Sequence, residues 1–240
     1  MIMRMQRTIL YFNINDISKY RSQLMGIATL LVILGHSAGN GVVMPEWMKS
    51  LCGLASVGVD VFLFVSGLGL WYSLKNLDEN RFGGGIKLWY LKRYKRILIP
   101  YLLISGFQQF LSVLHGTPIS QALLELSTIS YWINHRGAWF IAMLIPVYAM
   151  TPIHYNVCEK VGRPVLYSLV LVVIVVLIYS MDYRTGIEVV QQIIANIKHV
   201  LYHLPSFLIG FMLAPYSKTE KRVSNLWMIC LPIIVALMMK

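Results

Sequence analysis

Charged residues are scarce in this sequence: they make up 13% of its 240 residues, whereas hydrophobic residues make up 57%. A soluble domain averages about 25% charged and about 45–50% apolar residues, and a single core could not bury so large an apolar share. The mean hydropathy of +0.64 points the same way. This composition excludes an ordinary water-soluble domain and disfavours a disordered or collagen-like chain. We therefore expect an integral membrane protein.

Acidic residues and cysteines are also few. Ten aspartates and glutamates stand against 21 lysines and arginines, but the basic residues lie in loops between apolar runs, where membrane topology explains them without a nucleic-acid partner. The cysteines Cys52, Cys158 and Cys230 show no paired or metal-type spacing, so we expect no structural disulfide and no metal site. Repeats and low-complexity segments are missing, and the N-terminal apolar stretch is too short for a signal peptide.

Long apolar runs are what the sequence does contain. A bilayer needs roughly 20 predominantly apolar residues per helix, and seven runs approach that length: 23–37, 51–74, 97–114, 138–153, 165–179, 200–215 and 226–239. Residues 119–133 are apolar with Gln, Glu and Ser interspersed, which predicts an interfacial or re-entrant helix. The predicted fold class is all-α, a polytopic transmembrane helical bundle of about seven spans.

The distribution of lysine and arginine predicts the orientation. With the N-terminus inside, sixteen of the 21 lie in inner segments and four in outer segments, and Lys240 closes the chain. This bias follows the positive-inside rule, so we expect a cytoplasmic N-terminus. Residues 1–22 are predicted to be a cytoplasmic or interfacial lead-in, and residues 23–240 a multi-pass membrane domain.

Two ionisable side chains interrupt the predicted spans. His36 lies near the outer end of the first span, and Asp60 lies well inside the second. Such groups are costly in lipid and often functional, and a carboxylate beside a histidine fixes its tautomer and raises its basicity. The two helices are antiparallel neighbours, so the pair could meet across the bundle. Helix packing through polar hydrogen bonds explains the two residues equally well.

A basic cluster precedes the third span. Arg93 and Arg96 are three residues apart and share a helix face. Two guanidinium groups on one face suit a nucleotide phosphate, because their fork geometry matches phosphate oxygens. Membrane anchoring by positive charge is the alternative, and it also accounts for Lys92 and Lys95. Trp139 and Tyr148 open the fourth span, where aromatic residues commonly form an interfacial belt.

In series, these segments resemble the acyltransferase-3 family of integral membrane acyltransferases. The resemblance runs from about Arg21 to Tyr148. It rests on Gly-Ile-Ala…His at 26–36, Gly-Val-Asp-Val-Phe…Ser-Gly at 58–67, Arg-x-x-Arg with Pro-Tyr at 93–101, and Trp-Phe…Tyr at 139–148. Beyond Tyr148 the spans carry no diagnostic residues.

The resemblance implies roles for the residues in these motifs. His36 would be the catalytic histidine, acting as a base on the acceptor hydroxyl, with Asp60 as its orienting partner. The residues expected to bind acyl-CoA or substrate are Arg93, Arg96, Arg21, Tyr101 and Trp139. Members usually carry a basic residue eleven positions before the histidine. Here that position is Met25, and we expect Arg21, one turn earlier, to substitute for it.

The resemblance also implies an activity and its partners. The expected reaction moves an acyl group, most often acetyl, from acyl-CoA to a hydroxyl of a cell-surface glycan or a lipid-linked precursor. It takes place in a bilayer, expected to be a bacterial inner membrane, with no permanently bound cofactor. Family members have more spans than the seven predicted here, so the chain is expected to be incomplete or a short form. A non-catalytic remnant and a small-molecule transporter remain as alternatives.

Overall fold

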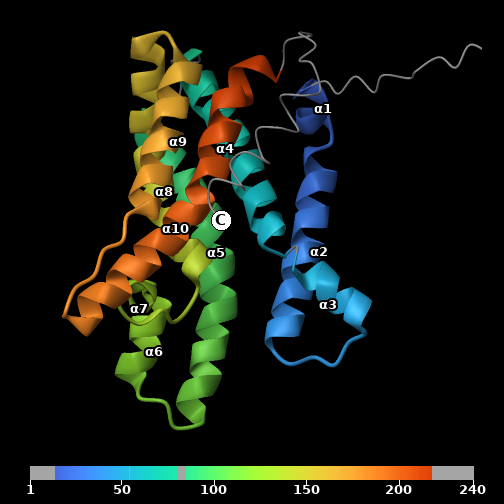
Figure 1. Cartoon of the computed structure of the whole chain (residues 1–240), viewed down its shortest axis with the longest axis vertical. Coiled ribbons are helices and arrows are strands. Elements are labelled where there is room, and N and C mark those ends of the chain that lie inside the picture. The colour runs from blue at the N-terminus through green and yellow to red at the C-terminus, as the bar shows by residue number, and fades with distance from the viewer. Residues whose placement is uncertain (1–13, 54, 80–84, 218–240) are drawn as a thin grey trace, which may run out of the picture. The chain divides into compact units, whose positions relative to one another are not determined.

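A computed structural model describes residues 14–53, 55–79 and 85–217, and within these ranges all of the regular secondary structure is helical (Figure 1). This confirms the all-α prediction. The helices in chain order are α1 (Ile14–Lys19), α2 (Arg21–Gly39), α3 (Glu46–Cys52), α4 (Ala55–Glu79), α5 (Gly85–Leu114), α6 (Ile119–Leu126), α7 (Ile129–Asn134), α8 (Trp139–Val161), α9 (Pro164–Ser180), α10 (Glu188–Leu213) and a closing 3₁₀ turn, η1 (Ala214–Tyr216).

Five of the described helices are long and apolar enough to cross a membrane. They cover Arg21–Gly39, Val57–Leu77, Gly85–Leu114, Trp139–Val161 and Glu188–Tyr216. The predicted span at 165–179 corresponds to the shorter apolar helix α9. The predicted span at 226–239 lies outside the described residues. The chain is therefore a helical membrane protein in which five described helices have the length and composition of a span, while the count of seven and the orientation stay predictions.

Two helices begin well before the apolar runs from which they were predicted. The run at 97–114 belongs to α5, which begins at Gly85, and the run at 200–215 belongs to α10, which begins at Glu188. Lysine, arginine and glutamine are good helix formers, so the helix continues through the basic and polar residues that a search for apolar runs leaves out. The basic segment 87–96 is consequently part of a helix and not a loop.

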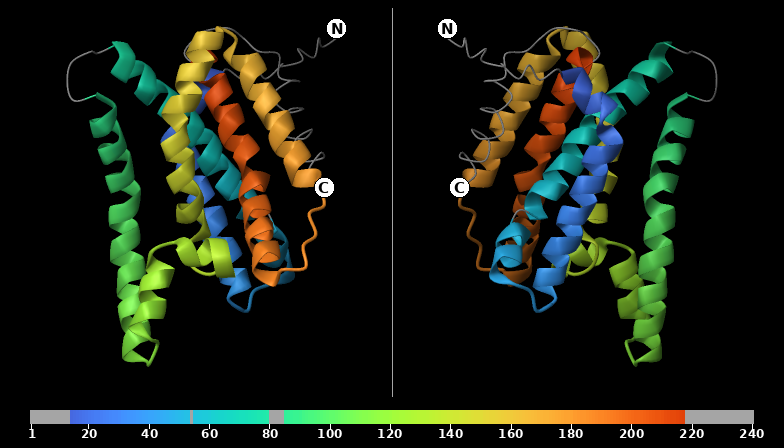
Figure 2. Two further views of the ribbon diagram at one scale, coloured as in Figure 1. Left: turned by 90° about the vertical axis from the view of Figure 1, so that its left-hand side faces the viewer. Right: turned by 90° about the vertical axis from the view of Figure 1, so that its right-hand side faces the viewer.

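The single helix expected at 119–133 is two short helices. α6 ends at Leu126 and α7 begins at Ile129. Between them Thr128 has φ +65°, a left-handed conformation that a continuous α-helix does not accommodate. α6 packs against α5, and α7 packs against α6 and α8 (Figure 2). The break lets the chain turn back toward the start of α8.

The chain divides into two compact units, residues 1–69 with 205–240 and residues 70–204. In the first unit, α4 and α10 cross at two glycines. A Cβ added at Gly67 would collide with the carbonyl oxygen of Phe207 and lie 2.8 Å from the amide nitrogen of Phe211, both on α10. A Cβ added at Gly210 would collide with the backbone of Phe64 on α4. Glycine at both positions therefore permits backbone contact between the two helices, as small residues commonly do in membrane bundles.

The second unit is held by hydrogen bonds from tyrosines on α5 to the backbone of its neighbours. Tyr90 Oη donates to the Ala149 carbonyl at 2.8 Å, and Tyr94 Oη donates to the Ile145 carbonyl at 3.0 Å. Both carbonyls belong to α8. These bonds fix α5 against α8 along the helix that carries Arg93 and Arg96.

Candidate functional site

His36 lies on the face of α2 that is turned toward α4 in the first unit. A Cβ at Gly58 of α4 would contact the Ala28 carbonyl at 2.8 Å and Val32 Cγ2 at 3.1 Å. Ala28, Val32 and His36 are spaced four residues apart and so share one helix face. His36 follows one turn after Val32, and its side chain is exposed. The imidazole therefore lies one turn beyond the contact between α2 and Gly58 of α4.

Asp60 points away from α2. It follows Gly58 by two residues, which turns it about 200° around α4, so the face of Gly58 that packs on α2 is not the face of Asp60. The carboxylate oxygen Oδ1 accepts a hydrogen bond from Ser206 Oγ on α10 at 2.9 Å. Within the described residues no hydrogen bond joins His36 to Asp60. The structure therefore places both predicted residues in one unit without pairing them.

Arg21 opens α2, and its guanidinium lies over Gly69 of α4. A Cβ added at Gly69 would lie 2.7 Å from Arg21 Nη2 and 3.0 Å from Cζ. The absence of a side chain at Gly69 is what makes room for the guanidinium. Arg21 and His36 therefore occupy opposite ends of α2, fifteen residues apart in the sequence.

Arg93 and Arg96 differ in their surroundings on α5. Arg93 is half-buried, and its Nη2 donates to Ser73 Oγ at 2.5 Å, while its guanidinium lies 5.8 Å from the Trp89 ring centre. Trp89 Nε1 donates to the same Ser73 oxygen at 2.7 Å. Arg96 is exposed. The guanidinium of Arg93 is therefore held by Ser73 of α4, whereas the side chain of Arg96 is exposed.

Tyr101 has a clear packing function. It is 8% exposed, and its hydroxyl donates to the Leu126 carbonyl at 3.1 Å and lies 3.4 Å from the Glu125 carbonyl. These two carbonyls lie in the last turn of α6, and that of Glu125 also accepts from the Thr128 amide at 3.3 Å. Tyr101 thus caps α6 and joins it to α5, a position that the sequence motif alone does not disclose.

Trp139 is the predicted residue with the richest surroundings. Its ring centre lies 4.6 Å from that of His199 and 5.2 Å from that of His203, both on α10. His135, just before α8, lies 5.7 Å from His199. Two of the six histidines of the chain therefore lie beside Trp139, and a third, His135, lies beside His199 in the same unit. We call the set Tyr131, His135, Trp139, Asn196, His199 and His203 the histidine cluster.

Asn196 holds this cluster together from a fully buried position on α10. Its Nδ2 donates to the carbonyls of Tyr131 at 2.8 Å and Trp132 at 3.0 Å. Its Oδ1 lies 2.5 Å from His135 Nδ1 and accepts from Gln192 Nε2 at 3.2 Å. All hydrogen-bonding groups of the amide are used, so Asn196 fixes the short helix α7 to α10.

Tyr131 adds a second link between the same helices. Its side chain has no exposed surface, and burial raises the pKa of its hydroxyl to about 12, so the hydroxyl stays protonated at neutral pH. It donates to the Asn196 carbonyl at 3.1 Å and shares a hydrogen bond of 3.0 Å with His199 Nδ1. The orientation of His199 is therefore set by a neutral hydroxyl.

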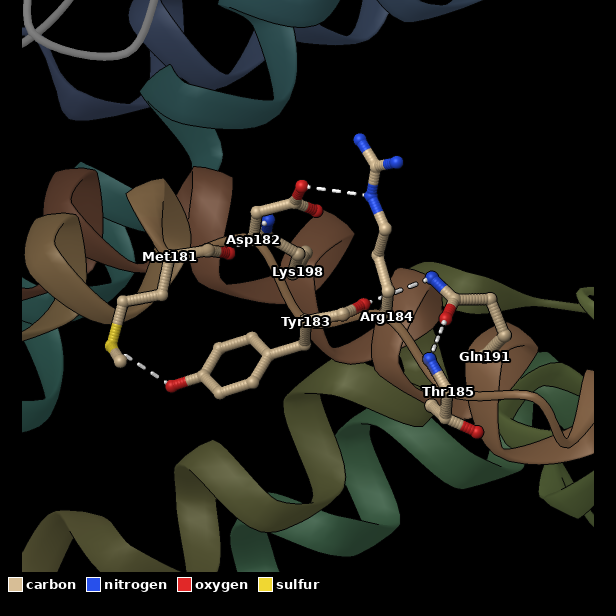
Figure 3. A network of polar contacts seen from close by, with 7 residues as sticks. All are labelled: Met181, Asp182, Tyr183, Arg184, Thr185, Gln191 and Lys198. Carbon is tan, nitrogen blue, oxygen red and sulfur yellow. Dashed lines mark hydrogen bonds and ion pairs between the residues drawn. The ribbon is translucent and has the colours of Figure 1, made fainter.

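The loop before α10 is ordered by its own network of polar contacts (Figure 3). Lys198 Nζ donates to the Met181 carbonyl at 2.8 Å, and Gln191 Nε2 donates to the Tyr183 carbonyl at 3.2 Å. Gln191 Oε1 also accepts from the Thr185 amide at 3.0 Å. Both Gln191 and Lys198 belong to α10, so the network fixes the helix immediately before His199.

The histidine cluster was not predicted from the sequence. His199 and His203 are four residues apart and so lie on one helix face, and two histidines at this spacing in an apolar helix were a signal worth following. The contribution of His135 and Asn196 depends on the fold of α7, which no local pattern indicates. Among the described residues, no group of three His, Cys, Asp or Glu side chains is arranged to hold a metal ion.

Comparison with known proteins gives one match. A family model described as an acyltransferase domain, that of the acyltransferase-3 family, matches residues 23–239, which includes every predicted site residue except Arg21. Neither the curated proteins nor the solved structures yield a match.

Proposed function

Because the chain belongs to the acyltransferase-3 family, we propose that it transfers an acyl group, acetyl above all, from acyl-CoA to a hydroxyl of a cell-surface glycan or its lipid-linked precursor. The observation that supports this most strongly is the family match across residues 23–239, together with the resemblance of the segments around His36 and the arginine pair to motifs of the family. The proposed location is a bacterial inner membrane, and acyl-CoA is a substrate and not a resident cofactor.

In this proposal His36 is the general base. A hydroxyl attacks a thioester carbonyl efficiently only as its proton is removed, and histidine is the side chain that ionises nearest neutral pH. The oxygen of the acceptor forms a bond to the acyl carbon while the imidazole takes the hydroxyl proton. The carbon–sulfur bond then breaks, and the imidazole gives the proton to the departing sulfur, so that CoA leaves as a thiol. The exposed position of His36 at the end of α2 is compatible with substrate contact.

Asp60 is proposed to support His36 from the same unit. A carboxylate accepts about four hydrogen bonds, so the bond from Ser206 to Oδ1 does not by itself prevent Asp60 from accepting one from the imidazole. Asp60→Asn separates the two roles, because an amide oxygen still accepts from Ser206 but carries no charge. A catalytic role predicts loss of turnover with normal insertion into the membrane, and a packing role predicts nearly normal turnover.

Arg93 and Arg96 are proposed to bind the phosphates of the donor, with Arg21, Tyr101 and Trp139 as further binding residues. Phosphate recognition fits the geometry of Arg93, because Ser73 and the Trp89 ring hold its guanidinium plane in one orientation. A pre-oriented guanidinium loses less side-chain entropy when it forms two parallel hydrogen bonds to a phosphate.

The experiment uses membranes that carry the chain, with radiolabelled acetyl-CoA as donor and label recovered in the glycan fraction. Membranes without the chain give the background. Replacing both Arg93 and Arg96 by lysine keeps the charge and loses the bidentate fork, so we expect the KM for acetyl-CoA to rise about tenfold or more. The matched control replaces the exposed Lys92 and Lys95 by glutamine. Anchoring by charge predicts damage only in the glutamine control, which would count against phosphate binding.

A further inference from the structure

His135 occupies a backbone conformation that few residues other than glycine adopt. Its φ is +55°, and in the described part of the chain only Thr128 shares this property among non-glycine residues. The two residues flank α7, one before its first residue and one after its last. Such left-handed residues cost of order 1–3 kcal/mol each and concentrate at functional sites. The backbone here is held in place by the Asn196 bonds to Tyr131 and Trp132.

Asn196 also determines which nitrogen of His135 carries the proton. Its Nδ2 faces two carbonyl oxygens, which can only accept, so the opposite atom of the amide is the oxygen. That oxygen lies 2.5 Å from His135 Nδ1, and two acceptors cannot share a hydrogen bond. Nδ1 is therefore the protonated nitrogen, and Nε2 of the neutral ring keeps its lone pair.

The side chain of His135 is exposed although one of its nitrogens is bonded to a buried residue. The Nε2 atom lies on the far side of the ring from that bond and is able to accept a hydrogen bond from a ligand. The ring centre of His135 lies 5.7 Å from that of His199 and 5.4 Å from that of Tyr131, and the Trp139 ring packs against His199. The members of the histidine cluster are aromatic rings and hydrogen-bonding groups, which suit a ligand ring that has both hydroxyl groups and an apolar face.

We propose that His135, held by Asn196, binds a hydroxyl group of the acyl acceptor, and that the histidine cluster forms an acceptor subsite for a polyhydroxylated ring such as a sugar unit. The inference rests on the proposed function. The Nε2 lone pair accepts from the hydroxyl, and the partly exposed rings of Trp139 and His199 offer apolar faces to the carbon–hydrogen face of the sugar ring. His135 is a binding residue here, and proton removal stays with His36.

Two substitutions of His135 separate this role from a structural one. His135→Asn places an amide nitrogen near the position of Nδ1, so it keeps the bond to Asn196, and asparagine tolerates the left-handed backbone. It removes the outward-facing acceptor. His135→Gln places its amide near the position of Nε2, so it keeps an outward acceptor and loses the bond to Asn196. If His135 binds the acceptor, His135→Asn should be the more damaging change. If His135 is only structural, His135→Gln should be the more damaging change.

The measurement is the KM for acceptor in membranes that carry the full chain. The probe is surface polysaccharide from the same cells, freed of O-acetyl groups by mild alkali, with radiolabelled acetyl-CoA as donor. We expect His135→Asn to raise the KM for this polysaccharide roughly 2- to 10-fold, the loss of about one hydrogen bond, at an unchanged KM for acetyl-CoA. His135→Gln should stay closer to the unmodified chain.

His115 supplies the matched control. It is exposed, its Nδ1 lies 2.8 Å from the Leu111 carbonyl, and it lies outside the histidine cluster. His115→Asn should leave both KM values unchanged. An acceptor KM that is unaffected by His135→Asn, or raised only by His135→Gln, overturns the proposal.

A direct binding measurement distinguishes failure of this subsite from failure of the proposed function. The chain is placed in lipid nanodiscs, and its retention by the same polysaccharide, immobilised, is compared with that of the His135→Asn variant. If the unmodified chain transfers no acetyl but is retained more strongly than the variant, the reaction is wrong and the subsite stands. If retention of the two is equal, the subsite is wrong whatever the outcome of the transfer assay.

Discussion

Replacing Asn196 by aspartate changes one atom of a fully buried side chain and removes two hydrogen-bond donors. In the native chain Nδ2 donates to the carbonyls of Tyr131 and Trp132 at 2.8 and 3.0 Å. An aspartate oxygen at that position faces both carbonyl oxygens with no hydrogen to share. Since the two side chains have nearly equal volume, the change measures the lost hydrogen bonds and the burial of a carboxylate, and not a loss of packing.

The magnitude follows from the two lost bonds. Each contributes about 1 kcal/mol net, and leaving a buried acceptor unsatisfied costs about 1–3 kcal/mol. The Tyr131 carbonyl keeps the His135 amide as a partner at 3.0 Å, which limits the loss at that group. We therefore expect the free energy of unfolding to fall by at least about 2–4 kcal/mol, equivalent to a Tm lower by at least about 5–15 °C for a chain of this size. The burial of the carboxylate adds to this loss.

The assay is thermal unfolding of the chain in lipid nanodiscs, combined with limited proteolysis. Because the bonds attach α7 to α10, cleavage should increase between residues 127 and 138 before it increases elsewhere. Asn134→Asp is the matched control, since Asn134 ends α7 with an exposed side chain. An Asn196→Asp variant as stable and as resistant to protease as the Asn134→Asp control would refute the role given to Asn196.

Three further predictions concern the packing of α4 against α10, the orientation of Arg93 and the membrane topology. Gly67→Ala and Gly210→Ala should each lower the free energy of unfolding by about 1–3 kcal/mol or more, because the added Cβ meets the backbone of the crossing helix. Gly106→Ala is the control in the same thermal assay. It should be neutral or slightly stabilising, because no atom lies within 4 Å of the added Cβ. Ser73→Ala should raise the KM for acetyl-CoA less than the double lysine variant does, since it frees the orientation of Arg93 without removing its guanidinium; an effect confined to expression level would show that Ser73 only packs. Cysteines introduced at Lys49 and Lys87 should react with a membrane-impermeant maleimide from opposite sides of intact vesicles, and reaction from the same side would contradict the predicted topology.

The helical nature of the chain and its family could be read from the sequence because both depend on local patterns. Apolar runs of span length and motifs of a few residues are visible without knowledge of the packing. The helix bounds were less accessible, since Gly85–Arg96 and Glu188–His199 contain polar residues that a helix tolerates and an apolar window rejects. The break at Thr128 depends on one backbone angle and left no signal of its own.

The relation of His36 to Asp60 shows why the site was harder to predict than the fold. Sequence order made the two helices antiparallel neighbours, but the rotation of α4 decides which side chain meets α2. The structure gives that position to Gly58 and turns Asp60 toward Ser206. The histidine cluster joins residues 60 or more positions apart, such as Tyr131 and Asn196, and contacts of this kind follow from tertiary packing that no short motif encodes.

Acetyl transfer by the His36→Gln variant is the most direct test of the central claim. Glutamine keeps similar bulk and hydrogen-bonding groups but cannot take up a proton at neutral pH, so a general base at this position predicts a loss of turnover of roughly 10²- to 10⁴-fold. The variant should insert into the membrane and unfold like the unmodified chain, because the exposed imidazole makes few contacts that glutamine cannot replace. Transfer of labelled acetyl to glycan by His36→Gln at the unmodified rate would contradict the account and remove His36 from the mechanism.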